Sequence, residues 1–484
     1  MTSNLWVGKL DVLLALKSPA LLAFIGILAA GSLLSVHLFL ARRRGRATKE
    51  EKSTPYALQF PPSRRHILAS LSNFEKSSQL LEIPPTTLKS RALPTTRAAD
   101  FSKDNQYTPT GFSTQEIRAL GRFPDYALLS GVRPPVPVAP DWDISKAKFR
   151  PYRPFRWRYH QHMALMKFEP DWWVELEKNY RETMAERQKI LKEHSSLIFF
   201  QGPGADLAVR ELMEMLLQFL CQRYPQHFSL SEDFALFRNG LLGTTTDLRT
   251  TPPLKVMFDN VPEDYAIMLR NEDDGFYYLR AAMTCSSVGW HVGMHRDKPL
   301  RSIHTHVPDA DKMAMSMDRW FSKVATDTPV NRCSWGIEDW QAMFTTPAID
   351  KNWSRSAFAQ NPKDLTVADL KLRCDAQTLR RLPLSGAVVF NFKAIFTPFE
   401  ELRDEPFIPA LLHKILLEGK ENLIDYKCEK TVPVRHLAMG ALEEWAKEQV
   451  TQGIVPEDWD IGTLDESLFF PGWEEKWRRQ QGLA

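Results

Sequence analysis

The feature that most constrains this chain is an uncharged apolar run at residues 19–41, PALLAFIGILAAGSLLSVHLFLA. An α-helix rises about 1.5 Å per residue, so roughly 20 such residues cross the hydrocarbon core of a bilayer. Arginines at positions 42, 43, 44 and 46 follow the run directly, whereas two lysines and the amino terminus precede it. Because basic flanks stay on the cytoplasmic side, we predict a transmembrane helix at 19–41, an extracytoplasmic N-terminus at 1–18 and a large cytosolic remainder.

A cleaved secretory signal is the alternative interpretation of this run. The run is longer than the usual apolar core of a signal peptide, and arginines stand where small residues would mark a cleavage site. We therefore predict an uncleaved anchor in a single-pass protein of an internal membrane, with the endoplasmic reticulum as the first expectation.

Charge and cysteine content narrow the possible functions. The 62 basic and 59 acidic residues give a net charge of +3, which provides no electrostatic reason to expect a nucleic-acid partner. The five cysteines are scattered and never spaced CxxC, which argues against a disulfide framework, a zinc ribbon and a cysteine-ligated iron–sulfur cluster. No GxGxxG, P-loop or GxSxG motif is present, so the chain shows no flavin or nucleotide site of its own.

Beyond the anchor, the amino-acid composition and the hydrophobic periodicity predict a linker, one domain and a tail. Residues 42–140 are rich in Ser, Thr, Pro and Arg and are predicted to be a largely irregular linker, although Ser113 and Glu116 form a capping box for one short helix. Residues 141–450 are predicted to fold, and residues 451–484 form the C-terminal tail. Helical periodicity over 171–194 and two strands at 370–382 and 387–396, joined by a Pro–Leu–Ser–Gly turn, predict an α+β domain with an antiparallel hairpin.

Four histidines lie close together in the segment WHVGMHRDKPLRSIHTHVP: His291, His295, His304 and His306. They allow three interpretations, namely ordinary side chains, a non-haem metal site, or an axial ligand of a haem. His304 and His306 would share one face of a strand, whereas His291 and His295 align only on a helix, which Gly293 disfavours. The residues alone leave these alternatives open.

From residue 151 to about 427 the chain resembles the haem-dependent oxidative N-demethylase family, and its fungal members in particular. The matching blocks, in the order of the family, are PYRPFRWRYHQHMAL, DWWVELEKNY, RYPQHF, PLRSIHTHVP, SMDRWF, QTLRRLPLSGAVVF and DEPFIPALL. The resemblance implies a PAS-like α+β fold, an antiparallel sheet with long flanking helices. It also implies a haem and the use of dioxygen, with electrons from a separate flavin and iron–sulfur reductase.

The family's Ile–His–x–x–Val–Pro block matches residues 303–308, so the resemblance implies that His304 is the iron ligand, with His306 as the alternative. Guanidinium groups pair well with carboxylates, which makes Arg373, Arg380 and Arg381 candidates for the haem propionates. Arg380 and Arg381 are neighbours on a strand, so they must point to opposite faces. Each could equally be a surface arginine.

Two residues, Tyr277 and Gln377, are candidate polar donors on the distal side of the haem. The chain departs from the family pattern on three strands, at Ser334, at Asp375 and Ala376, and at Asn391, Phe392 and Lys393. If these strands wall the haem pocket, the departures, those at Ala376, Asn391 and Lys393 above all, predict a substrate larger than dimethylamine. We therefore predict a haem-dependent mono-oxygenase that demethylates, or otherwise oxidises at C–H, an organic amine or secondary metabolite with the help of a redox partner protein. A non-catalytic haem or gas sensor and a metal site on the histidine cluster are the alternatives.

Overall fold

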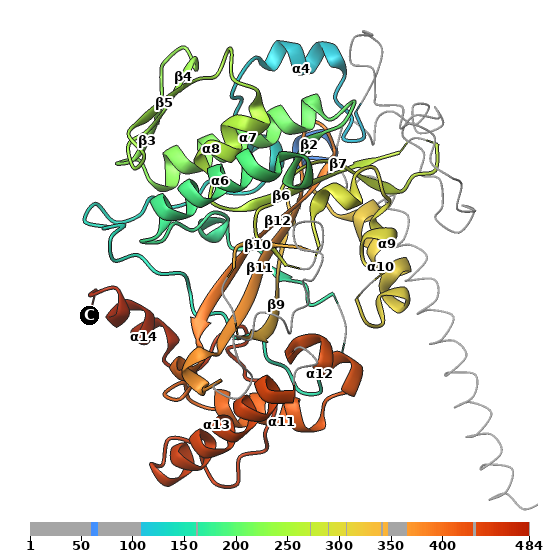
Figure 1. Ribbon diagram of the computed structural model, residues 1–484. Helices are drawn as coiled ribbons and strands as arrows, with labels where there is room; N and C mark the ends of the chain where they lie inside the picture. Colours follow the sequence, from blue (N-terminus) through green and yellow to red (C-terminus); the bar gives the residue numbers. More distant parts are fainter. Residues whose placement is uncertain are drawn as a thin grey trace, which may run out of the picture. The chain divides into compact units, whose positions relative to one another are not determined.

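The computed structural model describes residues 60–65, 108–160, 163–271, 273–288, 290–305, 307–339, 342–346, 365–428 and 432–483 (Figure 1). Contacts divide the chain into residues 1–57 and residues 58–484, and every element described below belongs to the second unit. The predicted transmembrane helix at 19–41 and the side chain of His306 lie outside the described residues. Within the described ranges, no helix combines the length and the apolar character that a bilayer span needs.

A seven-stranded sheet forms the centre of this unit, and every pair of neighbouring strands in it is antiparallel. Its strands, in spatial order, are β1 (Met166–Lys167), β9 (Val330–Glu338), β11 (Lys371–Arg381), β12 (Val388–Pro398), β6 (Asp264–Arg270), β7 (Tyr277–Met283) and β2 (Phe199–Gln201). A three-stranded antiparallel sheet joins β3 (Phe228–Leu230), β4 (Leu236–Asn239) and β5 (Thr244–Asp247), and β8 (Ser287–Val288) pairs with β10 (Phe344–Thr345) in parallel.

The predicted hairpin is confirmed as β11 and β12, which pair from Arg381 opposite Val388 to Lys371 opposite Pro398. Gly386 ends its turn with a φ of +70°, and a Cβ there would lie 2.9 Å from Pro109, so a side chain is excluded on two grounds. A buried carboxylate holds the turn in place, because Glu211 accepts hydrogen bonds from the backbone N–H groups of Leu384 (2.5 Å) and Ser385 (2.8 Å).

Helices cover the sheet and one end of it, so the predicted α+β class is confirmed (Figure 1). The helices are α4 (Thr114–Leu120), α5 (Tyr126–Ser130), α6 (Tyr180–Ile198), α7 (Asp206–Arg223), α8 (Pro253–Asn260), α9 (Leu300–Ile303), α10 (Ala310–Lys323), α11 (Ile408–Glu418), α12 (Glu421–Cys428), α13 (Val432–Thr451) and α14 (Trp473–Gln480). Short 3₁₀ helices include η3 (Pro170–Trp172) and η4 (Val292–His295). The PAS-like description rests on the resemblance alone.

Strand alternation divides the apolar residues of the sheet between two cores. On one face, Tyr265 and Val389 pack with α6, α7 and α8. On the other face, Met268 and Leu379 pack with residues of η4, α9 and α10. A third core lies where β9 and β11 meet α11 and α13. The second face carries the cavity described below.

Both predicted boundaries of the domain need correction. The capping box of Ser113 and Glu116 is confirmed at the start of α4. Residues 108–140, however, belong to the folded unit and not to a linker, because Phe112 and Tyr126 are buried in the first core. At the other end, α14 packs on the domain, since Lys476 donates to Asp404 (2.5 Å) and Glu405 (3.1 Å). The folded unit therefore extends at both ends beyond the predicted range 141–450.

The helix predicted over 171–194 begins later, at Tyr180, where α6 starts. The backbone N–H of Glu175 donates to the Glu263 carboxylate (3.1 Å), and that of Leu176 donates to the Tyr224 hydroxyl (3.3 Å). These tertiary hydrogen bonds take N–H groups that a helix would have used, and they override a favourable helical periodicity.

Candidate functional site: a cavity with a histidine and an arginine

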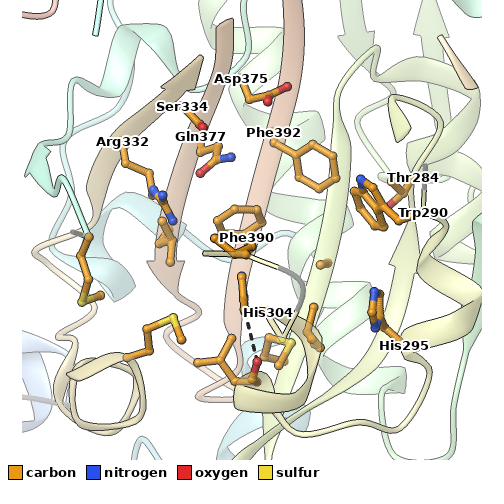
Figure 2. A pocket seen from close by; sticks show the side chains of 18 of the residues that line it. Thr284, Trp290, His295, His304, Arg332, Ser334, Asp375, Gln377, Phe390 and Phe392 are labelled. Atoms are coloured by element: carbon orange, nitrogen blue, oxygen red, sulfur yellow. Dashed lines mark hydrogen bonds between the residues drawn. The ribbon is translucent and has the colours of Figure 1, made fainter. Parts of the chain in front are cut away.

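A cavity of about 250 Å³ lies between the second face of the sheet and the helices α9 and α10 (Figure 2). Its walls are mostly apolar. The helical side contributes Leu300, Ile303, Met313, Met317 and Phe321, and the sheet contributes Ala266, Met268, Leu279, Leu379, Phe390 and Phe392. Such a lining keeps water away from whatever group the cavity holds and positions it through a few polar side chains.

His304 enters this cavity from the end of α9 (Figure 2). Its Nδ1 lies 3.1 Å from the carbonyl oxygen of Leu300. A carbonyl oxygen can only accept, so Nδ1 carries the proton and Nε2 is the basic nitrogen of the neutral ring. A hydrogen bond of this kind fixes the tautomer and orientation that an imidazole needs in order to ligate a metal through Nε2.

An ion pair holds α9, and with it His304, against α10. Arg301 donates through Nε to the Asp318 carboxylate at 3.1 Å, and its Nη2 contacts the same oxygen. The guanidinium also lies 4.3 Å from the ring centroid of Phe276. This ion pair therefore positions the turn at the end of α9 that carries His304.

A row of polar side chains from β9 and β11 lies at another part of the cavity (Figure 2). The register places Arg332 directly opposite Gln377 and Ser334 directly opposite Asp375. Residues at alternate positions of a strand share a face, so both cross-strand pairs point into the cavity. On the next strand, Phe392 lies opposite Gln377 and continues the same row as an aromatic wall.

Arg332 differs from Arg373, because its Nε is buried without an acceptor and no hydrogen bond or ion pair reaches it from the described part of the chain. Burial lowers the pKa of its guanidinium below the usual value. The side-chain oxygen Oε1 of Gln377 is likewise buried without a hydrogen-bond partner among the described residues. A buried polar group without a hydrogen-bond partner requires an explanation, and a ligand that binds to it would be such an explanation.

Two further cations line the cavity. Arg373 donates through Nε to Asp375 at 3.0 Å, so these two charges compensate each other. Lys427 of α12 donates to the hydroxyl of Ser334 at 2.8 Å. Asp375 compensates Arg373, whereas Arg332 has no carboxylate partner among the described residues, and such a cation suits an anionic group.

Three of the predicted site residues lie elsewhere. Arg381 is fully buried and donates to the carbonyl oxygens of Val324 (2.6 Å), Phe321 (2.6 Å) and Gly386 (2.9 Å). Tyr277 is also buried, and its hydroxyl accepts from Arg381 at 2.8 Å. Both groups brace the hairpin turn against α10 and do not line the cavity.

Arg380 points to the opposite face of the sheet, as strand alternation requires, and its guanidinium carbon lies 4.2 Å from the ring centroid of Trp173. Of the predicted propionate anchors, the structure therefore brings only Arg373 to the cavity; of the predicted donors, it brings only Gln377.

The histidine cluster is divided in the structure. His291 accepts from the backbone N–H of Met294 (3.1 Å) and caps η4. His295 is buried in the cavity wall beside Trp290, whose ring centroid is 6.1 Å away. Within the described residues, which leave out His306, no group of three or more His, Cys, Asp or Glu side chains could hold a metal ion.

The departures from the family pattern at Ala376, Asn391 and Lys393 face away from the cavity. Lys393 pairs with Glu263 at 2.6 Å, and Asn391 also donates to Glu263, on the face covered by α6 and α7. Ala376 packs in the third core. The prediction that these positions shape the pocket is therefore wrong for Ala376, Asn391 and Lys393, because strand alternation turns them to the other face. Ser334, Asp375 and Phe392, where the chain also departs from the family pattern, do line the cavity. The larger substrate stays a prediction.

The sequence marks Ser334 only as a departure from the family pattern, and it assigns no role in the site to Arg332 or Lys427. The first two carry a readable signal, since Arg332 and Ser334 alternate with the apolar Cys333 and Trp335 and so predict a polar row on one face of a strand. Lys427 has no such signal, because it lies in the last turn of α12, and the packing of that helix against β9 is a tertiary contact.

An α+β fold whose apolar cavity receives a histidine from a helix and cations from a sheet defines a protein suited to hold an anionic prosthetic group. Residues 164–435 match the family described as haem-dependent oxidative N-demethylase, alpha subunit-like, and the chain belongs to that family. The match covers more than half of the chain, and the residues that line the cavity run from Met163 to Lys427. The family makes the protein an oxidoreductase of the oxygenase type, and its description implies dependence on haem.

The residues of the cavity fit a haem on chemical grounds. The macrocycle needs flat apolar walls, which Phe390, Phe392 and the methionines of α10 provide. The iron needs a basic nitrogen, and the bond from Nδ1 of His304 to Leu300 leaves Nε2 as that nitrogen. The two propionates need cations, and Arg332 lacks any partner within the described residues.

Proposed function

We propose that this protein binds haem through Nε2 of His304 and oxidatively demethylates an organic amine. The observation that carries the proposal is the fixed tautomer of His304 in an apolar cavity within the family-matched segment. When bound, the haem supplies the site at which dioxygen is activated for oxidation of an unactivated C–H bond.

The chain's own residues would perform three tasks in this reaction. His304 would hold the iron from the helical side, and Arg332 with Lys427 would bind the propionate carboxylates. Gln377, whose Oε1 has no hydrogen-bond partner among the described residues, would accept a hydrogen bond from the substrate's N–H group. Phe390 and Phe392 would exclude water and contact the apolar part of the substrate.

The reaction requires electrons that the chain does not store. For a secondary methylated amine, R–NH–CH₃ + O₂ + 2 e⁻ + 2 H⁺ gives R–NH₂ + HCHO + H₂O. Two of the four electrons that reduce dioxygen come from the substrate's C–H bond, and the other two must come from a partner. We propose a separate flavin and iron–sulfur reductase, in agreement with the lack of GxGxxG and CxxC motifs in this sequence.

A direct test is aerobic incubation of the reduced haem-loaded protein with an electron donor and a panel of methylated amines. We expect formaldehyde in a one-to-one ratio to the demethylated amine and in a substrate-dependent manner. Stable binding of dioxygen or carbon monoxide, with no product and no substrate-induced change of the haem spectrum, would instead identify a gas sensor.

Arg332→Met tests the proposed propionate contact. A hydrogen bond to a charged group contributes about 1.5–3 kcal/mol, so the affinity for haem should fall about tenfold to a hundredfold. Because the iron ligand is retained, the Soret maximum of the haem that does bind should not move. Titration of the apoprotein with haem, followed by absorption spectroscopy, gives both the dissociation constant and the Soret maximum. Arg249→Met is the matched control, because Arg249 pairs with Asp247 away from the cavity, and it should change neither the haem affinity nor the Soret maximum. Unchanged haem affinity in Arg332→Met would contradict the contact.

We also propose that residues 19–41 anchor the protein in an internal membrane, with the family domain in the cytosol. The uncharged run and the arginines after it support this topology. The sequence offers its own reporter, because Asn352–Trp353–Ser354 is an N-glycosylation acceptor. We expect no glycan on Asn352 and a membrane-pellet fraction that alkaline washing does not release; a glycosylated or released protein would overturn the topology.

A further inference from the structure

A second buried arginine lacks a partner on the face of β11 opposite the cavity. Arg380 is 4% exposed, its Nε is buried without an acceptor, and no hydrogen bond or ion pair from the described residues reaches it. Burial lowers the pKa of its guanidinium to about 10, so the group stays charged at neutral pH. Stacking on Trp173 at 4.2 Å stabilises the cation in part, but it leaves the planar N–H donors unused.

Arg380 lines a hollow of about 50 Å³, which lies between α5, α7 and the segments that contain Pro134 and Phe168. The indole Nε1 of Trp173, another lining residue, is also buried without an acceptor among the described residues. No acidic side chain is among the described residues that line the hollow. The nearby carboxylate of Glu211 is engaged, because it accepts the N–H groups of Leu384 and Ser385.

We propose that this hollow is a binding site for a small monovalent carboxylate of the size of formate or acetate. A guanidinium presents two parallel N–H donors that match the two oxygens of a carboxylate. A single uncompensated cation favours a monovalent anion, and a hollow of about 50 Å³ accommodates a few heavy atoms. The apolar rings of Phe168 and Phe219 suit the hydrogen or methyl group of such a ligand.

This inference does not depend on the proposed haem chemistry, because Arg380 and the cavity lie on opposite faces of the sheet. The test is titration of the full-length protein with ¹³C-labelled acetate, followed by NMR line broadening and by calorimetry. We expect one saturable site with a dissociation constant of about 1 mM, in line with the affinity that a ligand of four heavy atoms can reach. Arg380→Met should weaken this binding at least tenfold.

Two further variants separate this site from the cavity and from a folding defect. Arg332→Met removes the unpartnered cation of the cavity and should leave acetate binding unchanged. Ala127→Leu adds bulk to the lining from α5, keeps Arg380, and should also weaken acetate binding at least tenfold. The proposal is overturned if wild-type protein shows no saturable acetate binding, or if binding survives in Arg380→Met and is lost in Arg332→Met. Sulfate bound as tightly as acetate would overturn the carboxylate class.

Discussion

His304→Ala is expected to abolish stoichiometric haem binding, seen as loss of the Soret band after reconstitution. In the proposed function Nε2 of His304 is the iron ligand, and the hydrogen bond from Nδ1 to the carbonyl oxygen of Leu300 orients this ring. The remaining apolar and cationic contacts would hold haem weakly and without a defined ligand. Far-UV circular dichroism should stay unchanged, because His304 lies at the end of a four-residue helix and is only half-buried.

Two comparisons make this result specific to the ligand. His304→Gly leaves space beside the iron position, so millimolar imidazole should restore the Soret band in that variant. His295→Ala removes another histidine from the same cavity and should retain haem. Full haem retention in His304→Ala with loss in His306→Ala would transfer the ligand role to His306, and absence of haem in the wild type under every condition would remove the haem proposal.

Asp264→Ala is expected to lower the free energy of unfolding by about 3–5 kcal/mol, since it leaves a fully buried cation without its partner. Arg187 of α6 contacts the Asp264 carboxylate at 2.5 Å, and both side chains are 0% exposed. The same carboxylate accepts the N–H groups of Cys285 (2.9 Å) and Ser286 (2.6 Å). It thereby joins α6 to β6 and to the segment that follows β7, and Ser286 of that segment lines the cavity.

The measurement is urea unfolding, monitored by tryptophan fluorescence at equilibrium. A domain is stable by about 5–15 kcal/mol in total, so the loss should shift the midpoint clearly. Arg187→Met/Asp264→Ala should be less destabilised than the sum of the single variants, because the double variant leaves no unpaired buried charge. Strictly additive losses would show that the two side chains do not act as a pair. Asp247→Ala, at an exposed ion pair with Arg249, should have a far smaller effect.

Local sequence signals determined much of the secondary structure. The turn Pro–Leu–Ser–Gly between two apolar runs predicted the β11–β12 hairpin, and Ser113 with Glu116 predicted the start of α4; both are confirmed. These signals are reliable because the hydrogen bonds and backbone angles that they specify lie within a few residues of chain. The family assignment likewise followed from short blocks of sequence, and the match over residues 164–435 confirms it.

Which side chains share the site was decided by the tertiary structure. Strand alternation predicted that Arg380 and Arg381 point to opposite faces of β11, but it could not predict which of them reaches the cavity. Neither does: Arg380 lies on the opposite face, and Arg381, on the cavity's face, lies beyond the cavity and donates its hydrogen bonds to backbone carbonyl groups next to α10. The pairing of Arg332 with Gln377 depends on the register between β9 and β11, two strands far apart in sequence. No local pattern encodes that register, since it is fixed by the packing of the whole sheet.

The sequence by itself therefore determined the family, the α+β class, the hairpin and the histidine that we propose as ligand. The tertiary structure decided where the folded unit begins, why the helix predicted at 171 starts at Tyr180, and which arginine is left without a partner in the cavity. The physical reason is the same in each case. The carboxylates of Glu263 and Glu211 accept hydrogen bonds from backbone N–H groups that are distant in the sequence, and burial makes those hydrogen bonds decisive over local propensity.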